Sequence, residues 1–204
     1  GSSVSGNWLT CSTETGIMTA VTGFPFADVP TNAWYFGDAY YAYNNALFAG
    51  TGANTFSPNV TMTRGMLVTV LWRMEGSPKA AAPTFSDTRG IWCSEAVGWA
   101  AANGIVNGFD NNTFSPNGTV TREQMAAILY RYAAFKGIDV SAADDLGSFA
   151  DFESVSAYAR TAIAWASAEG IINGSADGRL MPKAGATRAQ VAAILHRYIE
   201  NCIF

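Results

Sequence analysis

Three arginines recur at one unusual place in the chain, directly after a threonine and directly before an apolar run of helical period. They lie in "TMTRGMLVTVL", "TVTREQMAAIL" and "GATRAQVAAIL", as Arg64, Arg122 and Arg188. A threonine before such a run predicts a helix N-cap, which places the arginine at the first helical position. The positive end of the helix macrodipole lies there, and a cation in the first turn is electrostatically unfavourable. A placement repeated three times against that preference requires a specific partner.

Anion binding is the first chemistry that this placement predicts. The first backbone N–H groups of a helix have no intrahelical partner, and a guanidinium matches a carboxylate or phosphate. The alternative is an internal salt bridge to the aspartate that opens each repeat, namely Asp28, Asp87 and Asp151. The two roles are compatible if the aspartate orients the arginine, and the spacing alone does not decide between them.

Helix capping explains the neighbours of the arginines but not the arginines themselves. Thr121 with Gln124 and Thr187 with Gln190 fit the capping-box pattern, in which the third helical residue bonds back to the cap. The first copy has Met66 in that position and lacks the box.

Aromatic residues and glycines recur near the arginines and are further candidates for ligand contact. The tryptophans of the first helical segments are Trp34, Trp92, Trp99 and Trp165. An indole at a groove edge suits the apolar face of a sugar, and core packing is the alternative. A short loop in each repeat ends at Gly50, Gly108 and Gly174. Glycine there predicts a turn with positive φ, and its bare backbone would also admit a ligand.

The elements that position these residues form three tandem repeats. The units open with "FADV", "FSDT" and "FADF", continue with an alanine- and aromatic-rich helical segment, and place a proline six residues before the arginine. Each ends in an apolar helix that closes with "LWR", "LYR" or "LHR". The predicted fold is mainly α, with an N-terminal extension at 1–23 and repeats at 24–79, 80–140 and 141–204. A unit of ~60 residues buries too little surface to be stable alone, so we expect the three to pack around a shared axis.

Composition excludes several classes of protein. With 49% hydrophobic and 14% charged residues in 204, the chain is expected to fold around a core. A net charge of −4 without a basic run argues against nucleic acid, and no apolar stretch is long enough for membrane insertion. Cys11, Cys93 and Cys202 fit no zinc motif, although Cys11 and Cys202 could form a disulfide between the ends. We expect no metal and no cofactor.

An enzyme is disfavoured as well. The candidate carboxylates recur once in each repeat, which suits repeated binding better than one asymmetric active site. His196 is the single histidine, and Trp72 and Tyr130 take its place in the other repeats. It is therefore interpreted as a packing or surface residue.

The ordered elements F-x-D, W…A, "GIVNG", "FSP" and TRxQ resemble the S-layer homology family, in three copies over roughly residues 24 to 200. The resemblance implies a compact, pseudo-threefold SLH trimer with ligand grooves between the repeats. It also implies a non-catalytic module that anchors a larger surface protein, as a monomer of three repeats, to the Gram-positive cell wall. The family's usual ligand is an acidic secondary cell-wall polysaccharide, often carrying a pyruvylated amino sugar. The alternative is a protein-interaction or self-assembly module of a surface protein.

The family motif transfers onto the residues already singled out. Its threonine–arginine pair falls on the three arginines above, and its opening aspartate on the three aspartates. The glutamate that ends the motif is replaced here by Met66, Gln124 and Gln190. The first copy departs most, through Gly65, Met66 and its "LFAGTG" loop, so the number of working grooves stays open.

Overall fold

The computed structural model describes residues 23–81 and 83–203. Its α helices are α1 (Phe36–Asn44), α2 (Arg64–Met74), α3 (Ser94–Ala102), α4 (Arg122–Phe135), α5 (Arg160–Ala168) and α6 (Arg188–Cys202). The 3₁₀ helices are η1 (Leu146–Ser148), η2 (Phe152–Ser154) and η3 (Ala157–Ala159). Extended pairing in this part of the chain is limited to isolated bridges. The mainly helical class is therefore confirmed, while the predicted strand or arm at 1–23 and the Cys11–Cys202 disulfide fall on residues outside the described part.

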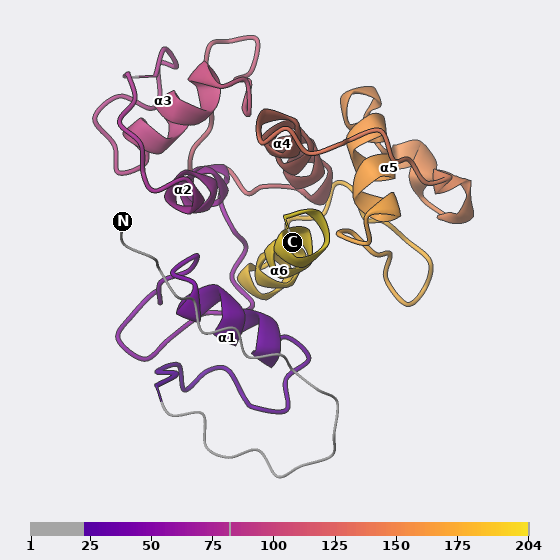
Figure 1. The fold of residues 1–204 in the computed structure, drawn as a ribbon, viewed down its shortest axis with the longest axis horizontal. Helices are drawn as coiled ribbons and strands as arrows, with labels where there is room; N and C mark the ends of the chain where they lie inside the picture. Colours follow the sequence, from indigo (N-terminus) through magenta and orange to yellow (C-terminus); the bar gives the residue numbers. More distant parts are fainter. Residues whose placement is uncertain (1–22, 82, 204) are drawn as a thin grey trace, which may run out of the picture.

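The second helices of the repeats, α2, α4 and α6, lie at the centre of the molecule, and α1, α3 and α5 surround them (Figure 1). We call the central three the closing helices. Each outer helix packs on the closing helix of another repeat: α3 on α2, α5 on α4, and α1 on α6. The contact of α1 with α6 joins the first repeat to the last. A packing lobe is therefore built from two repeats, and the ring is closed without a second chain.

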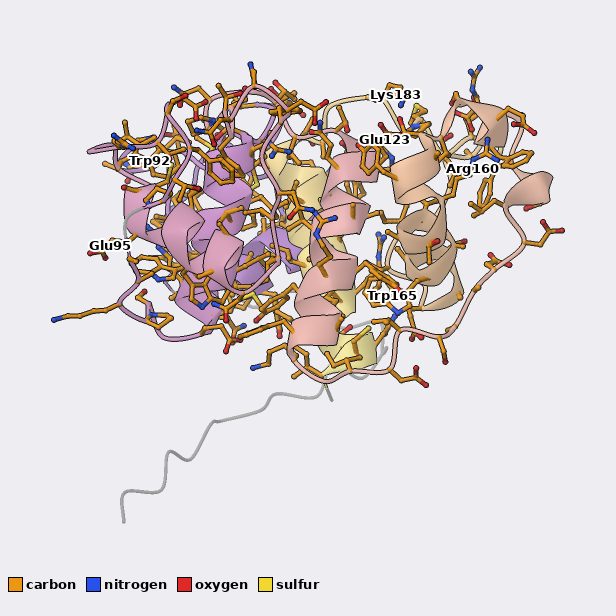
Figure 2. The ribbon with its side chains drawn as sticks, turned by 90° about the horizontal axis from the view of Figure 1, so that it is seen from above. Trp92, Glu95, Glu123, Arg160, Trp165 and Lys183 are labelled. Carbon is orange, nitrogen blue, oxygen red and sulfur yellow. The ribbon has the colours of Figure 1, made fainter. Side chains whose placement is uncertain are left out.

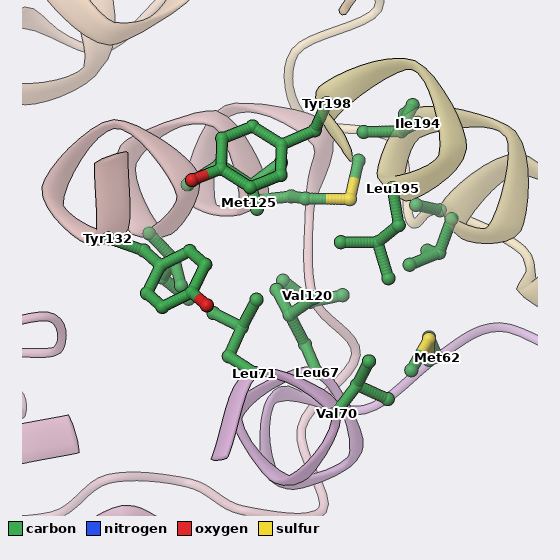
Figure 3. Packing of buried hydrophobic residues seen from close by; sticks show 14 of the residues in the cluster. Met62, Leu67, Val70, Leu71, Val120, Met125, Tyr132, Ile194, Leu195 and Tyr198 are labelled. Atoms are coloured by element: carbon green, nitrogen blue, oxygen red, sulfur yellow. The ribbon is translucent and has the colours of Figure 1, made fainter. Parts of the chain in front are cut away.

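The closing helices turn apolar faces toward one another and form the core. Figure 3 shows Leu67, Met125, Leu195 and Tyr198 converging from the three helices. The face predicted for α4 is confirmed, since each of its residues is at most 1% exposed: Met125, Ile128, Leu129 and Tyr132. Each such side chain contributes roughly 1.5–3 kcal/mol by leaving water. The shared core explains why the repeats fold together.

Three backbone hydrogen bonds hold the segments that lead into the closing helices. The Met62 amide donates to the Ala186 carbonyl at 2.9 Å, the Ala186 amide to Val120 at 3.1 Å, and the Val120 amide to Met62 at 2.9 Å. Each segment thus donates to one neighbour and accepts from the other. This cyclic junction fixes the N-termini of α2, α4 and α6 close together, where the recurring arginines lie.

His196 lies at the contact between α1 and α6. Its Nδ1 is 2.8 Å from an Asp38 carboxylate oxygen, its Nε2 is 3.2 Å from Glu200, and its ring stacks on Tyr41 with centroids 3.8 Å apart. The hydrogen bond to Asp38 raises the pKa of His196 despite partial burial, and Glu200 adds to the shift. The histidine is thus a packing residue, as predicted, and it also carries a charge link between the first and last repeats.

We predict that the protein becomes less stable between pH 5.5 and pH 8 and that His196→Gln removes most of this change. A histidine whose pKa is raised on folding stabilises the protein fully below its unfolded pKa of ~6.5. That contribution is lost as the pH rises through the raised folded value. We expect ~0.5–1 kcal/mol, the range of partly exposed ion pairs. Urea unfolding at the two pH values measures it, and equal slopes in both proteins would contradict the prediction.

Candidate functional site

The first-turn amides of the closing helices are already bonded within the protein. In α4 the amide of Arg122 donates to the Ala184 carbonyl and that of Glu123 to Pro182, both at 3.0 Å. The third amide donates to the Thr121 hydroxyl at 3.3 Å. Equivalent bonds occupy the first turns of α2 and α6. The expectation of free backbone donors is therefore wrong, and an anion at these sites must be bound by side chains.

Capping follows the prediction made from the threonines and glutamines. Thr121 with Gln124 and Thr187 with Gln190 form complete capping boxes. In α2 Thr63 caps the Met66 amide without a returning side chain. The threonines and glutamines are thus accounted for by helix termination.

The recurring arginines reach across to the loop of the next repeat. The Nε atoms donate to backbone carbonyls, Arg64 to Phe114 at 2.8 Å, Arg122 to Leu180 at 2.7 Å and Arg188 to Phe56 at 2.7 Å. The arginines are only 5–7% exposed, and burial lowers the pKa of each. A buried cation needs such partners. The unfavourable first-turn position therefore serves a contact between repeats.

The opening aspartates grip the same loop residues from the other side. Asp28 accepts the amides of Phe56 and Ser57, both at 2.7 Å. Asp87 and Asp151 accept two amides each at equivalent positions. In the described residues no ion pair joins these aspartates to Arg64, Arg122 or Arg188. The direct salt bridge is therefore wrong, but one loop residue receives the aspartate on its N–H and the arginine on its carbonyl.

The loop glycines are explained by close packing. A Cβ atom would lie 2.5 Å from the Phe26 ring at Gly50 and 2.6 Å from the Phe149 ring at Gly174, and Gly108 meets Phe85 in the same way. None of these glycines has a positive φ. The predicted positive-φ turn is wrong, because it is the opening phenylalanine that excludes a side chain here.

The predicted tryptophans divide between core and surface. Trp99 and Trp165 are 5% and 0% exposed and belong to the core. Trp34 and Trp92 are 65% and 60% exposed. Both lie two residues before an outer helix, and Tyr158 holds the same position before α5. Only this surface position is available to a ligand.

Two surface grooves bring the predicted residues together. The groove of about 190 Å³, the Arg122 groove, is lined by Arg122, Trp34, Gly174, Gln190 and Arg197, among others. The groove of about 410 Å³, the Arg188 groove, is lined by Arg188, Trp92, Gly50, Met66 and Arg73, among others. Each combines an arginine of one repeat, the loop and closing helix of the next, and the aromatic residue of the third.

A second arginine in each groove was not predicted as a site residue. Arg73 is exposed, and Arg197 is half-buried and donates from Nη1 to the Ile171 carbonyl at 3.2 Å. The sequence contained the signal, because these arginines end the recurring "LWR" and "LHR". Each groove therefore presents two guanidinium groups and one indole.

No helix among the described residues is both long enough and apolar enough to cross a bilayer. Within residues 23–81 and 83–203, no group of three potential metal-ligating side chains is gathered in one place.

The fold and its grooves define a tandem-repeat binding domain in which each site draws on three repeats. The model of the S-layer homology domain family matches residues 25–65, 84–126 and 148–192. The chain belongs to the S-layer homology domain family. As a member, it is a cell-wall anchoring module of the bacterial cell surface.

Three relatives show in what company this segment occurs. The chain is 32% identical to an endoglucanase of Bacillus sp. (strain KSM-635), over 84% of the chain and 18% of the relative. It is 34% identical to an amylopullulanase of Thermoanaerobacterium thermosulfurigenes, over 72% of the chain and 8% of the relative. It is 30% identical to the surface-layer 125 kDa protein of Lysinibacillus sphaericus, over 74% and 13% respectively. The chain thus spans less than a fifth of the length of these relatives.

We predict that Asp151→Asn lowers the free energy of unfolding at pH 7 by about 1–3 kcal/mol, because an amide cannot accept both N–H groups. Burial would raise the pKa of Asp151, but the amides of Leu180 and Met181 and the Arg179 guanidinium hold it below its usual range. Such a carboxylate stabilises the fold above its unfolded pKa, and this stability is lost as the pH falls through the folded value. The variant should therefore also unfold less steeply in acid.

Urea denaturation at pH 7 and pH 4 measures both effects. Glu153→Gln is the matched control, because this side chain is 77% exposed and pairs only with Arg160 at the surface. If Asp151→Asn is as stable as Glu153→Gln, the grip on the loop does not stabilise the fold.

Proposed function

We propose that the chain is a non-catalytic module that binds an acidic secondary cell-wall polysaccharide in its inter-repeat grooves, with a pyruvyl carboxylate as the acidic group. The observation that carries the proposal is the pairing of guanidinium groups with an exposed indole, built twice on equivalent positions. In this proposal the single chain acts as a monomer and anchors a larger surface protein, since the ring closes through α1 and α6.

The charges of the grooves favour an acidic ligand. The whole chain has a net charge of −4, so general attraction to a polyanion is not expected. The positive charge is local, with Arg122 and Arg197 in one groove and Arg188 and Arg73 in the other. A guanidinium binds a planar carboxylate through parallel hydrogen bonds. Neutral Gln190 and Met66 line the grooves where the family motif carries a glutamate, which removes a competing negative charge.

The exposed indoles favour a sugar. Trp34 and Trp92 keep more than half of their surface in water, although they are among the largest apolar side chains. A flat ring of this kind covers the apolar face of a pyranose and leaves the hydroxyl groups to polar neighbours. An acidic, glycosidic polymer satisfies both halves of each groove.

The lining of the grooves argues against glycoside hydrolysis. That reaction requires a pair of carboxyl groups flanking the scissile bond. The residues that line the Arg122 and Arg188 grooves include no aspartate and no glutamate. The enzymatic names of some relatives then belong to the parts of those proteins that this chain does not cover.

We predict that Arg73→Gln with Arg197→Gln weakens binding to Lysinibacillus sphaericus cell walls at least tenfold. A charge-assisted hydrogen bond contributes about 1.5–3 kcal/mol, and about 1.4 kcal/mol corresponds to a factor of ten. These arginines are better targets than the first-turn set, which holds the fold together. Lys79→Gln with Arg160→Gln changes the net charge equally, lies outside both groove linings, and should bind as the unaltered protein does.

Sedimentation with walls before and after chemical removal of their attached polysaccharide tests the ligand class. Loss of binding on stripping, together with the weaker double variant, supports the proposal. Equal binding to stripped walls would reject it and identify peptidoglycan or a wall protein as the partner, the latter being the interaction-module alternative. Equal binding by the two double variants would reject the role of the groove charges.

A further inference from the structure

The third position where a groove is expected, beside Arg64, differs from the other two. The residue after the loop glycine is Thr51 in the first repeat and Ser175 in the third, and both line grooves. In the second repeat it is Phe109. The Arg64 guanidinium lies 4.9 Å from the centroid of this ring. Because Phe109 is 46% exposed, the ring covers the guanidinium from the solvent side.

The hydrogen bonds of Arg64 differ accordingly. Arg122 and Arg188 each donate a second bond, from Nη2, to a carbonyl of the glycine loop, at 3.1 Å and 2.8 Å. In the described residues Arg64 donates only from Nε, to Phe114, and its guanidinium also lies over the Phe114 ring at 4.6 Å. Aromatic faces therefore occupy the side of Arg64 that would bind an anion.

A carboxylate stands at the aromatic edge of the same groove. Glu123, the second residue of α4, is 4% exposed, and its equivalents are the neutral Gly65 and Ala189. It accepts the Tyr158 hydroxyl at 3.2 Å and the Ser156 hydroxyl at 3.0 Å.

Lys183 completes this cluster. Its Nζ lies 2.6 Å from a Glu123 carboxylate oxygen and also contacts the Ser156 hydroxyl (Figure 2). Tyr158, the aromatic residue of this groove, is thereby tied to a negative group. An acidic ligand near Arg64 would meet both the Phe109 ring and the Glu123 carboxylate.

We infer that the chain binds two glycan segments, one in the Arg122 groove and one in the Arg188 groove, and that Phe109 and Glu123 close the third. The inference rests on the function proposed above and assigns its stoichiometry. Two sites on one rigid ring let a single chain bind one polymer twice, which strengthens attachment without new contacts.

Native mass spectrometry with a synthetic pyruvylated amino-sugar glycoside counts the sites directly. The unaltered protein should saturate at two ligands. Phe109→Ser together with Glu123→Ala, which copies Ser175 and Ala189, should raise this number to three. Ser175→Phe copies the closed groove and should lower it to one. Position 109 is nearly half exposed, so Phe109→Ser alone is a second opening variant, and circular dichroism checks that each protein is folded.

The outcomes separate the inference from the proposed function. Three ligands on the unaltered protein, or one, would overturn the inference and leave the polysaccharide ligand standing. Two ligands on the opened variants, or two on Ser175→Phe, would also overturn it. No ligand on any protein, with wall binding insensitive to stripping, would reject the proposed function and the inference with it.

Discussion

The structure depends on a buried guanidinium that holds the loop of a neighbouring repeat. Removing a cation from water is costly, and each arginine recovers this cost through backbone carbonyls and, for Arg64 and Arg188, through aromatic faces. The opening aspartate of the next repeat secures the same loop residue by its amide. Because the contacts run in a cycle, each repeat holds one neighbour and is held by the other. The repeats are therefore parts of one folding unit, although they are separate units in the sequence.

The same cycle places the ligand grooves. An arginine that must reach the next repeat brings its guanidinium to a seam between repeats, and the loop glycine and closing helix of that neighbour form the floor. The outer helix of the third repeat then contributes its exposed aromatic residue. No repeat alone contains a complete site. Folding and binding consequently use the same residues, while Arg73 and Arg197 at the groove edge are free to serve the ligand.

Much of this could be predicted from the sequence, because it is local. The threonine caps, the apolar face of α4 and the inward-facing Phe56 and Phe114 follow from spacing and residue type. Tertiary facts could not be predicted in this way. The sequence identifies Arg122 as unusual, but only the packing shows that its partner is the Leu180 carbonyl rather than an aspartate. Likewise, Trp92 and Trp99 differ by seven residues along one segment, and only the outer-helix packing exposes one and buries the other.

Repeats that share a backbone can still diverge at positions that the cycle does not use. The first-turn arginine, the opening aspartate and the loop glycine recur because the contacts between repeats require them. The residue after the loop glycine and the second residue of the closing helix carry no such contact through their side chains in every repeat, and they vary from Thr51 to Phe109 and from Gly65 to Glu123. Both sets of positions face the grooves. The number of open grooves can therefore change by substitution while the ring stays intact, which separates the evolution of binding capacity from that of the fold.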